Sequence, residues 1–293
     1  MVRLGPNRYG KAEVHVVTVG RGAAPDGGDV LRDRRVSTSL SGELAATHLV
    51  GDNRHVVATD SQKNAVNVFV RRLGDVEPET LALALGRHFV DEHEHIDRAR
   101  VAVEEYPWVR LGASPHSFAR SGQYVRTTTA VVDGELGVGV VSGVARLVVL
   151  TTTNSEFWGF ARDALTTLPD TKDRMLATEV SARWRYRSAG DAEADWSAAW
   201  TAAYQELLAA FSQTYSYSLQ QTLFAMGRRV LEAVPAICEV RLVLPNKHHY
   251  LVDLEPFGLE NENQVYYAAD RPYGLIEGAV LADDAPDADF AWD

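Results

Sequence analysis

Short stretches of alternating apolar and polar residues recur along the whole chain. Such alternation predicts half-buried β-strands, because successive side chains of a strand point to opposite faces of its sheet. In the first half of the chain it predicts strands at 13–19, 35–40, 101–109 and 124–132. In the second half it predicts strands at 136–151, 177–186, 239–244 and 265–268. Each half therefore contains two pairs of strands.

Between the strand pairs of each half, apolar residues recur at the spacing of a helix. In the first half these residues are Ala65, Phe69 and Leu73, followed by Leu81, Leu85 and Phe89. In the second half they are Trp196, Trp200, Ala203, Tyr204, Leu207, Leu208 and Phe211, then Leu223, Met226, Val230 and Val234, before Pro235. Apolar stripes of this kind are typical of helices that pack one face on a core. The predicted order is ββααββ, twice.

The repeated ββααββ order predicts an α+β fold in which two antiparallel sheets each carry a helix pair on one face. The predicted division is 1–135 for the first half, 136–281 for the second half and 282–293 for an acidic, solvated C-terminal tail. The second face of each sheet needs a cover as well. Because the chain has no spare element for this purpose, we expect another subunit to provide it.

The composition is that of a globular protein, with 46% hydrophobic and 24% charged residues. Its formal charge of −11 argues against nucleic acids and anionic membranes as partners, since both bind basic surfaces. No apolar run reaches the ~20 residues of a membrane span, and the N-terminus lacks the apolar core of a secretory signal. A single cysteine, Cys238, excludes an intrachain disulfide. These features predict a cytoplasmic protein.

The stretch 245–251, with the sequence PNKHHYL, follows one of the predicted strands. If the strand continues, Asn246 and His248 share one face, while Lys247 and His249 lie on the other. An amide and an imidazole side by side can hold one small polar group, and the imidazole can exchange a proton near neutral pH. The alternative is a polar strand end at the surface.

Two other groups of residues are weaker candidates for a functional site. The glycine-rich stretch 20–29 carries no Lys-Ser/Thr pair and opens no helix, so we expect a hairpin connection rather than a phosphate cradle. His88, His93 and His95 are candidate ligands of a metal ion. On one helix, however, His93 would be rotated away from the other two, which favours a solvated helix end.

Further candidate site residues lie at or between the ends of the predicted strands and helices. Lys11 stands at the start of the first strand, and either Thr59 or Asp60 is expected to cap the helix that follows an apolar triplet. Backbone N–H groups at such a helix end can bind acceptor-rich groups. The aromatic stretch 157–160 is either buried core or a stacking platform for a flat ligand. Arg174 is either a two-pronged donor or part of a surface salt bridge.

Together these segments resemble the urate oxidase (uricase) family over essentially the whole chain. The motifs that carry the resemblance are YGK at 9–11, VVATDSQKN at 56–64, NSEFWGFARD at 154–163, TTL at 166–168, DR at 173–174, AT at 177–178, SLQQT at 218–222, LPNKH at 244–248 and DRPYGLI at 270–276. The resemblance implies the tunnelling fold (T-fold), with two ββααββ halves per chain. It also implies a homotetramer that forms a barrel around a central tunnel.

The resemblance also implies a set of substrate-binding residues. By motif they are Thr59, Asp60, Phe157, Arg174, Leu219, Gln220 and Asn246. Phe157 would stack on the purine ring, and Arg174 and Gln220 would hold its two ends. Leu219 would add a backbone N–H group, and Asn246 would hold dioxygen and later water.

A proton relay of Lys11, Thr59 and His248 is implied as well. Thr59 and Asp60 would reach the ring from a neighbouring subunit, so the site would lie at a subunit interface. A removable proton matters because a deprotonated urate gives up an electron to dioxygen more readily.

The implied reaction is the oxidation of urate by dioxygen and water to 5-hydroxyisourate and hydrogen peroxide, with no flavin, haem or metal. The C-terminus lacks a Ser-Lys-Leu-like peroxisomal tripeptide, which favours a cytoplasmic enzyme. Two alternatives stay open: a metal-dependent T-fold hydrolase or cyclohydrolase acting on a pterin or purine, and a purine-binding protein without activity. Loss of the urate absorbance band in air, with peroxide formed, distinguishes the three.

Overall fold

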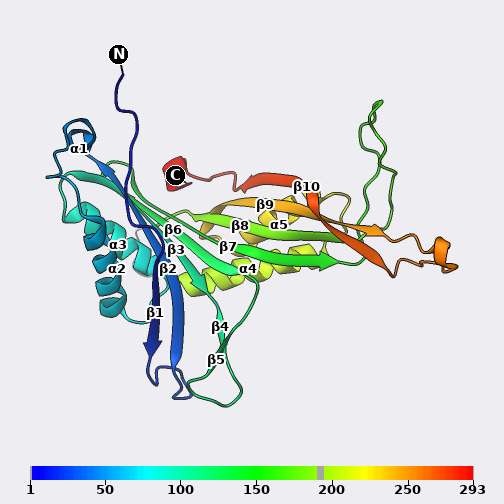
Figure 1. Cartoon of the computed structure of the whole chain (residues 1–293), viewed down its shortest axis with the longest axis horizontal. Helices are drawn as coiled ribbons and strands as arrows, with labels where there is room; N and C mark the ends of the chain where they lie inside the picture. The colour runs from blue at the N-terminus through cyan, green and yellow to red at the C-terminus, as the bar shows by residue number, and fades with distance from the viewer. Residues whose placement is uncertain (1, 190–194, 293) are drawn as a thin grey trace. The chain divides into compact units, whose positions relative to one another are not determined.

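The computed structural model describes residues 2–189 and 195–292 (Figure 1). The chain forms two compact units. The first comprises the residues up to Gly143, Trp184–Trp200 and the residues from Pro286 onward. The second comprises Val144–Arg183 and Thr201–Ala285. The division at 135 and 281 that the sequence suggested stays a prediction.

The first unit is built on antiparallel strands. Its elements are β1 (Val14–Gly20), β2 (Val30–Gly42), α1 (Ala45–Val50), α2 (Thr59–Leu73), α3 (Pro78–Asp91), β3 (Ile96–Tyr106), β4 (Trp108–Arg110), β5 (Phe118–Arg120) and β6 (Val125–Asp133). The strand order is β1-β2-β3-β6, with all pairs antiparallel. Helix α3 packs on β3 and β6.

The core of the first unit explains the alternation in its sequence. Val36 on β2 pairs with Val103 on β3, and both side chains are buried. Leu81, Leu85 and Phe89 of α3 are buried as well. Burying each side chain of this size contributes about 1.5–3 kcal/mol relative to leaving it exposed. The apolar face of the sheet and the apolar stripe of α3 therefore stabilise one another.

The second unit repeats this plan. Its elements are most of β7 (Gly137–Thr151) and β8 (Leu176–Tyr186), most of α4 (Trp196–Gln213), and α5 (Leu219–Ala233), β9 (Ile237–Leu251), a short 3-10 helix (Glu255–Phe257) and β10 (Tyr266–Leu281). The strand order is β7-β8-β9-β10, and α5 packs on β9 and β10 (Figure 1). At Gly227 of α5 an added Cβ would lie 2.5 Å from a methyl carbon of Val280, so the helix approaches β10 closely because this residue is glycine.

The ββααββ order is confirmed in both halves, and the protein has the α+β, antiparallel T-fold class that the sequence indicated. No periodic pattern in the sequence predicted α1 or the β4–β5 hairpin. Two strands are longer than predicted: β9 continues to Leu251 and β10 to Leu281. These two strands pair over almost their full lengths, and backbone hydrogen bonds between partners sustain a strand where its own sequence pattern fades.

Two local predictions were wrong. Neither Thr59 nor Asp60 caps α2: the N-cap is Ala58, without a side-chain hydrogen bond, and Thr59 is the first helical residue. The C-terminal segment is not a fully solvated tail, since a 3-10 helix (Asp289–Trp292) ends it and Ala291 is buried. Acidic composition indicated solvent exposure, but the apolar residues within the segment pack instead. Asp293 lies outside the described residues.

None of the helices in the described ranges is long and apolar enough to cross a membrane.

Candidate active site

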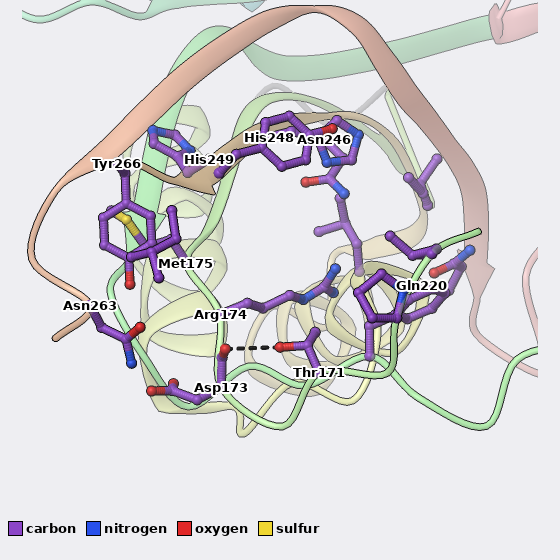
Figure 2. A pocket seen from close by; sticks show the side chains of 17 residues that line it. Thr171, Asp173, Arg174, Met175, Gln220, Asn246, His248, His249, Asn263 and Tyr266 are labelled. Carbon is purple, nitrogen blue, oxygen red and sulfur yellow. Dashed lines mark hydrogen bonds between the residues drawn. The ribbon is translucent and has the colours of Figure 1, made fainter. Parts of the chain in front are cut away.

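The second unit contains a cavity of about 510 Å³, within the usual size range of small-molecule sites. Six of the expected site residues line it: Phe157, Arg174, Leu219, Gln220, Asn246 and His248. Figure 2 shows Arg174 entering the cavity from one side, while Asn246 and His248 lie along the opposite side. Segments far apart in the sequence thus bring polar groups together around one space.

Arg174 carries an uncompensated positive charge into this cavity. Its side chain is half-buried, and burial lowers the pKa of the guanidinium, which still remains charged at neutral pH. In the described part of the chain no carboxylate forms an ion pair with it. The adjacent Asp173 carboxylate instead accepts a hydrogen bond from Thr153 Oγ1 at 2.8 Å. A half-buried charge without a partner of opposite charge is costly, so this site favours an anionic ligand.

Phe157 provides a flat surface beside that charge. Its backbone N–H donates to Thr171 O at 2.8 Å, and the Thr171 N–H donates back to Phe157 O at 2.9 Å. The Phe157 ring stacks on Phe160 with centroids 5.0 Å apart, and the Arg174 guanidinium carbon lies 5.1 Å from the Phe157 centroid. Phe160 and the Arg174 guanidinium therefore hold the Phe157 ring in place at the cavity wall.

The start of α5 supplies neutral donors. The Ser218 side chain caps the helix by accepting from the Gln221 N–H at 3.1 Å. The first backbone N–H groups of a helix have no intrahelical acceptor, so those of Leu219 and Gln220 can donate to a ligand. The Leu219 side chain is buried and anchors the helix, whereas Gln220 is exposed.

His248 is suited to accept a proton. Desolvation, followed by the charge of Arg174 and the neighbouring His249, lowers the pKa of its imidazole below the ordinary value. A lowered imidazole pKa means that the ring is neutral at pH 7 and becomes charged only at a lower pH than usual. The ring also stacks with Tyr250, at a centroid distance of 5.8 Å.

The strand alternation predicted for 246–251 holds only in part. Lys247 points away from the cavity, and its Nζ lies 2.9 Å from Glu179. His249, however, lines the cavity together with His248, contrary to the expected alternation. The pairing of β9 with β10 is irregular between Ala269 and Gly274, and strict alternation fails where a strand pair is irregular.

Sequence reasoning missed several other residues of the cavity wall. Met175, His249, Asn263 and Tyr266 contribute to it, and Figure 2 shows them on the side away from Gln220. The position of His249 beside His248 was a usable signal. The other three carry no motif or spacing that would have singled them out.

Lys11 lies in the first unit and does not line the cavity. The segment before β1 runs along β2, where the Tyr9 N–H donates to Leu40 O at 3.0 Å and the Thr38 N–H donates to Lys11 O at 2.9 Å. A Cβ on Gly10 would lie 1.8 Å from Thr38 O, so this close approach requires glycine. Backbone contacts therefore fix the position of Lys11.

The start of α2 lies near Lys11. The Val57 N–H donates to Tyr9 Oη at 2.7 Å, which ties this end of the helix to the segment that carries the lysine. The Asp60 pKa is lowered, mainly by the hydrogen bond from Lys63 and to a smaller extent by the charge of Lys11. Thr59 and Asp60 are both exposed, and neither lines the cavity of the second unit. Lys11, Thr59 and Asp60 thus form a separate cluster.

The histidines do not form a metal site in the arrangement considered from the sequence. Helix α3 ends at Asp91, so His93 and His95 lie beyond it. Their rings are 5.9 Å apart, and that of His88 is 6.2 Å from His93. Across residues 2–189 and 195–292, no three His, Cys, Asp or Glu residues are grouped so that they could hold a metal ion.

The stretch 20–29 connects β1 and β2 as a hairpin, as predicted.

Similarity to known proteins agrees with the resemblance. The Uricase family model matches residues 7–131 and 140–277. The chain is 47% identical to the uricase of Arthrobacter globiformis over 279 residues, which is 95% of this chain and 90% of that protein. It is 36% identical to the uricase of Dictyostelium discoideum over 286 residues, 96% of this chain and 98% of that protein. The crystal structure of the Arthrobacter globiformis uricase covers 100% of this chain at 45% identity, with 99% of that chain matched and a TM-score of 0.94. The chain belongs to the uricase family.

Proposed function

We propose that this protein oxidises urate with dioxygen and water to 5-hydroxyisourate and hydrogen peroxide, without flavin, haem or metal. Membership of the uricase family supports oxidation of urate. The observation that carries the proposal furthest is the unpaired, half-buried charge of Arg174 beside the flat ring of Phe157. A planar anion satisfies both features at once.

In this proposal the cavity orients the purine ring. Phe157 stacks on the ring, while Arg174 holds one edge through two parallel N–H groups and Gln220 holds the other through its amide. The Leu219 backbone N–H adds a donor from the start of α5. These contacts fix the reacting carbon relative to the groups above the ring, which is the positional part of catalysis.

Asn246 and His248 act above the purine ring. Asn246 holds dioxygen and then water, and the neutral imidazole of His248 takes up a proton. Lys11, Thr59 and Asp60 reach the same ring from a neighbouring subunit of a homotetramer, and Lys11, Thr59 and His248 form the relay. Support for this assignment comes from the match of these residues to the family's motifs.

The purified protein, after treatment with a chelator, should consume urate at an undiminished rate. The expected result is loss of the urate absorbance band together with uptake of dioxygen and formation of peroxide in equal amounts. Urate oxidation that disappears with the chelator and returns only with a metal would contradict the metal-free reaction, and loss of substrate without uptake of dioxygen or formation of peroxide would support the metal-dependent hydrolase alternative. Binding of urate without any turnover would support the purine-binding alternative.

Replacement of Arg174 by alanine should raise KM for urate about 10- to 100-fold, because a charge-assisted hydrogen bond is worth roughly 1.5–3 kcal/mol and 1.4 kcal/mol corresponds to a factor of ten. Steady-state kinetics at saturating dioxygen would measure it. Arg228→Ala is a matched control, since Arg228 is an exposed residue of α5 that pairs with Glu232 outside the cavity. Equal KM values for Arg174→Ala and Arg228→Ala would contradict the assignment.

A further inference from the structure

Ser155 lies behind Arg174 and is fully buried. Its hydroxyl oxygen accepts a hydrogen bond from Arg174 Nε at 3.1 Å, and its carbonyl oxygen accepts from the Arg174 backbone N–H at 3.0 Å. Ser155 does not line the cavity. It therefore contacts the arginine from the protein side at both the backbone and the side chain.

The same short segment also connects to the start of α5. Ser155 forms a parallel bridge with Ser216, in which the Glu156 N–H donates to Ser216 O at 2.7 Å and the Ser216 N–H donates to Asn154 O at 2.9 Å. The Thr222 hydroxyl of α5 lies 2.8 Å from the Ser216 hydroxyl, and both side chains are buried. The segment around Ser155 is thus the connection between Arg174 and the helix that begins with Leu219 and Gln220.

A hydrogen bond at Nε has a specific consequence for a guanidinium group. The group is planar, so an acceptor at Nε restricts rotation of the whole plane and leaves the two terminal nitrogens to form parallel contacts with a ligand. An arginine without such a restraint loses rotamer freedom when a ligand binds, and affinity falls accordingly. Ordering the side chain in advance removes this cost.

We propose that Ser155 is a positioning residue that sets the plane of the Arg174 guanidinium for a flat anionic substrate. This inference rests on the proposed function, since it assigns Arg174 to one end of urate. Ser155 acts only through Arg174. It should therefore affect how tightly urate binds and should leave the oxidation step nearly unchanged.

Ser155→Ala should raise KM for urate about tenfold, the value of a hydrogen bond to a charged group, while kcat changes by less than about twofold. Ser155→Cys is the second variant, because a thiol fills nearly the same volume but is a weak acceptor. It should keep the folded structure, as judged by thermal unfolding, and still show most of the increase in KM. A Ser155→Cys protein with wild-type KM would overturn the proposal.

A double-mutant cycle separates positioning from general loss of packing. In an Arg174→Ala background, Ser155→Ala should have no further effect on urate binding measured without dioxygen. Ser216→Ala removes a buried hydroxyl of the same kind that does not contact Arg174, so its effect should be equal in both backgrounds. An undiminished effect of Ser155→Ala in the Arg174→Ala background would contradict the proposal. If the wild-type protein binds urate but does not oxidise it, the proposed function fails, while the cycle still tests Ser155.

Discussion

Replacement of Lys11 by methionine should lower kcat by about 10²–10⁴-fold, the usual contribution of a positioned acid or base. Methionine keeps an unbranched side chain of similar length but cannot carry a proton. The backbone contacts that hold this position, including the Thr38 N–H to Lys11 O bond, do not depend on the side chain. We therefore expect the fold to persist while proton transfer fails.

Steady-state kinetics and urate binding without dioxygen would measure the two effects separately. Binding should change little, because the role proposed for Lys11 is proton transfer in the relay and not contact with the purine ring. Lys247→Met is a matched control: Lys247 follows Asn246 on β9, yet its ammonium group pairs with Glu179 and does not line the cavity. Near-normal turnover by the Lys11→Met protein would show that the relay is assigned incorrectly.

Two variants that should each be only weakly active at urate concentrations well below KM, Thr59→Ala and Arg174→Ala, should regain activity when they are unfolded together and reassembled. If the protein is the proposed homotetramer and Thr59 of one subunit serves the cavity of another, mixed assemblies contain sites in which both residues are intact. Random mixing of equal amounts makes such sites about a quarter of the total in a symmetric assembly. The measurement is urate oxidation by the mixture, compared with each variant taken through the same procedure alone.

A second mixture provides the control. Arg174 and Gln220 line the same cavity of one chain, so mixing Arg174→Ala with Gln220→Ala leaves every cavity defective and should restore nothing. Differently tagged chains establish that mixed tetramers have formed. If they form and the Thr59→Ala and Arg174→Ala mixture stays as weakly active as its components, the interface model is wrong and each site is built within one chain.

The regular elements were predictable because their signals are local. Alternation along 136–151 and the apolar stripe through Leu223, Met226 and Val230 predicted β7 and α5, since each pattern follows from the geometry of a single element. The full length of β10 was not predictable in this way. Its residues pair with β9 as far as Leu281, and a strand's partner contributes to its stability independently of its own sequence pattern.

The candidate site likewise combines features that the sequence predicts with features that only the tertiary structure shows. The sequence by itself indicated the family and, through its motifs, every residue that the proposal assigns to urate or to the relay, because a motif can be read from the order of residues along the chain. Only the tertiary structure placed Arg174, Gln220, Asn246 and His248 around one cavity and left the guanidinium without a carboxylate partner among the described residues. Only the tertiary structure also showed Ser155 behind that guanidinium. The physical reason is that hydrogen bonds between distant segments set these positions, and such contacts leave no periodic pattern in the sequence.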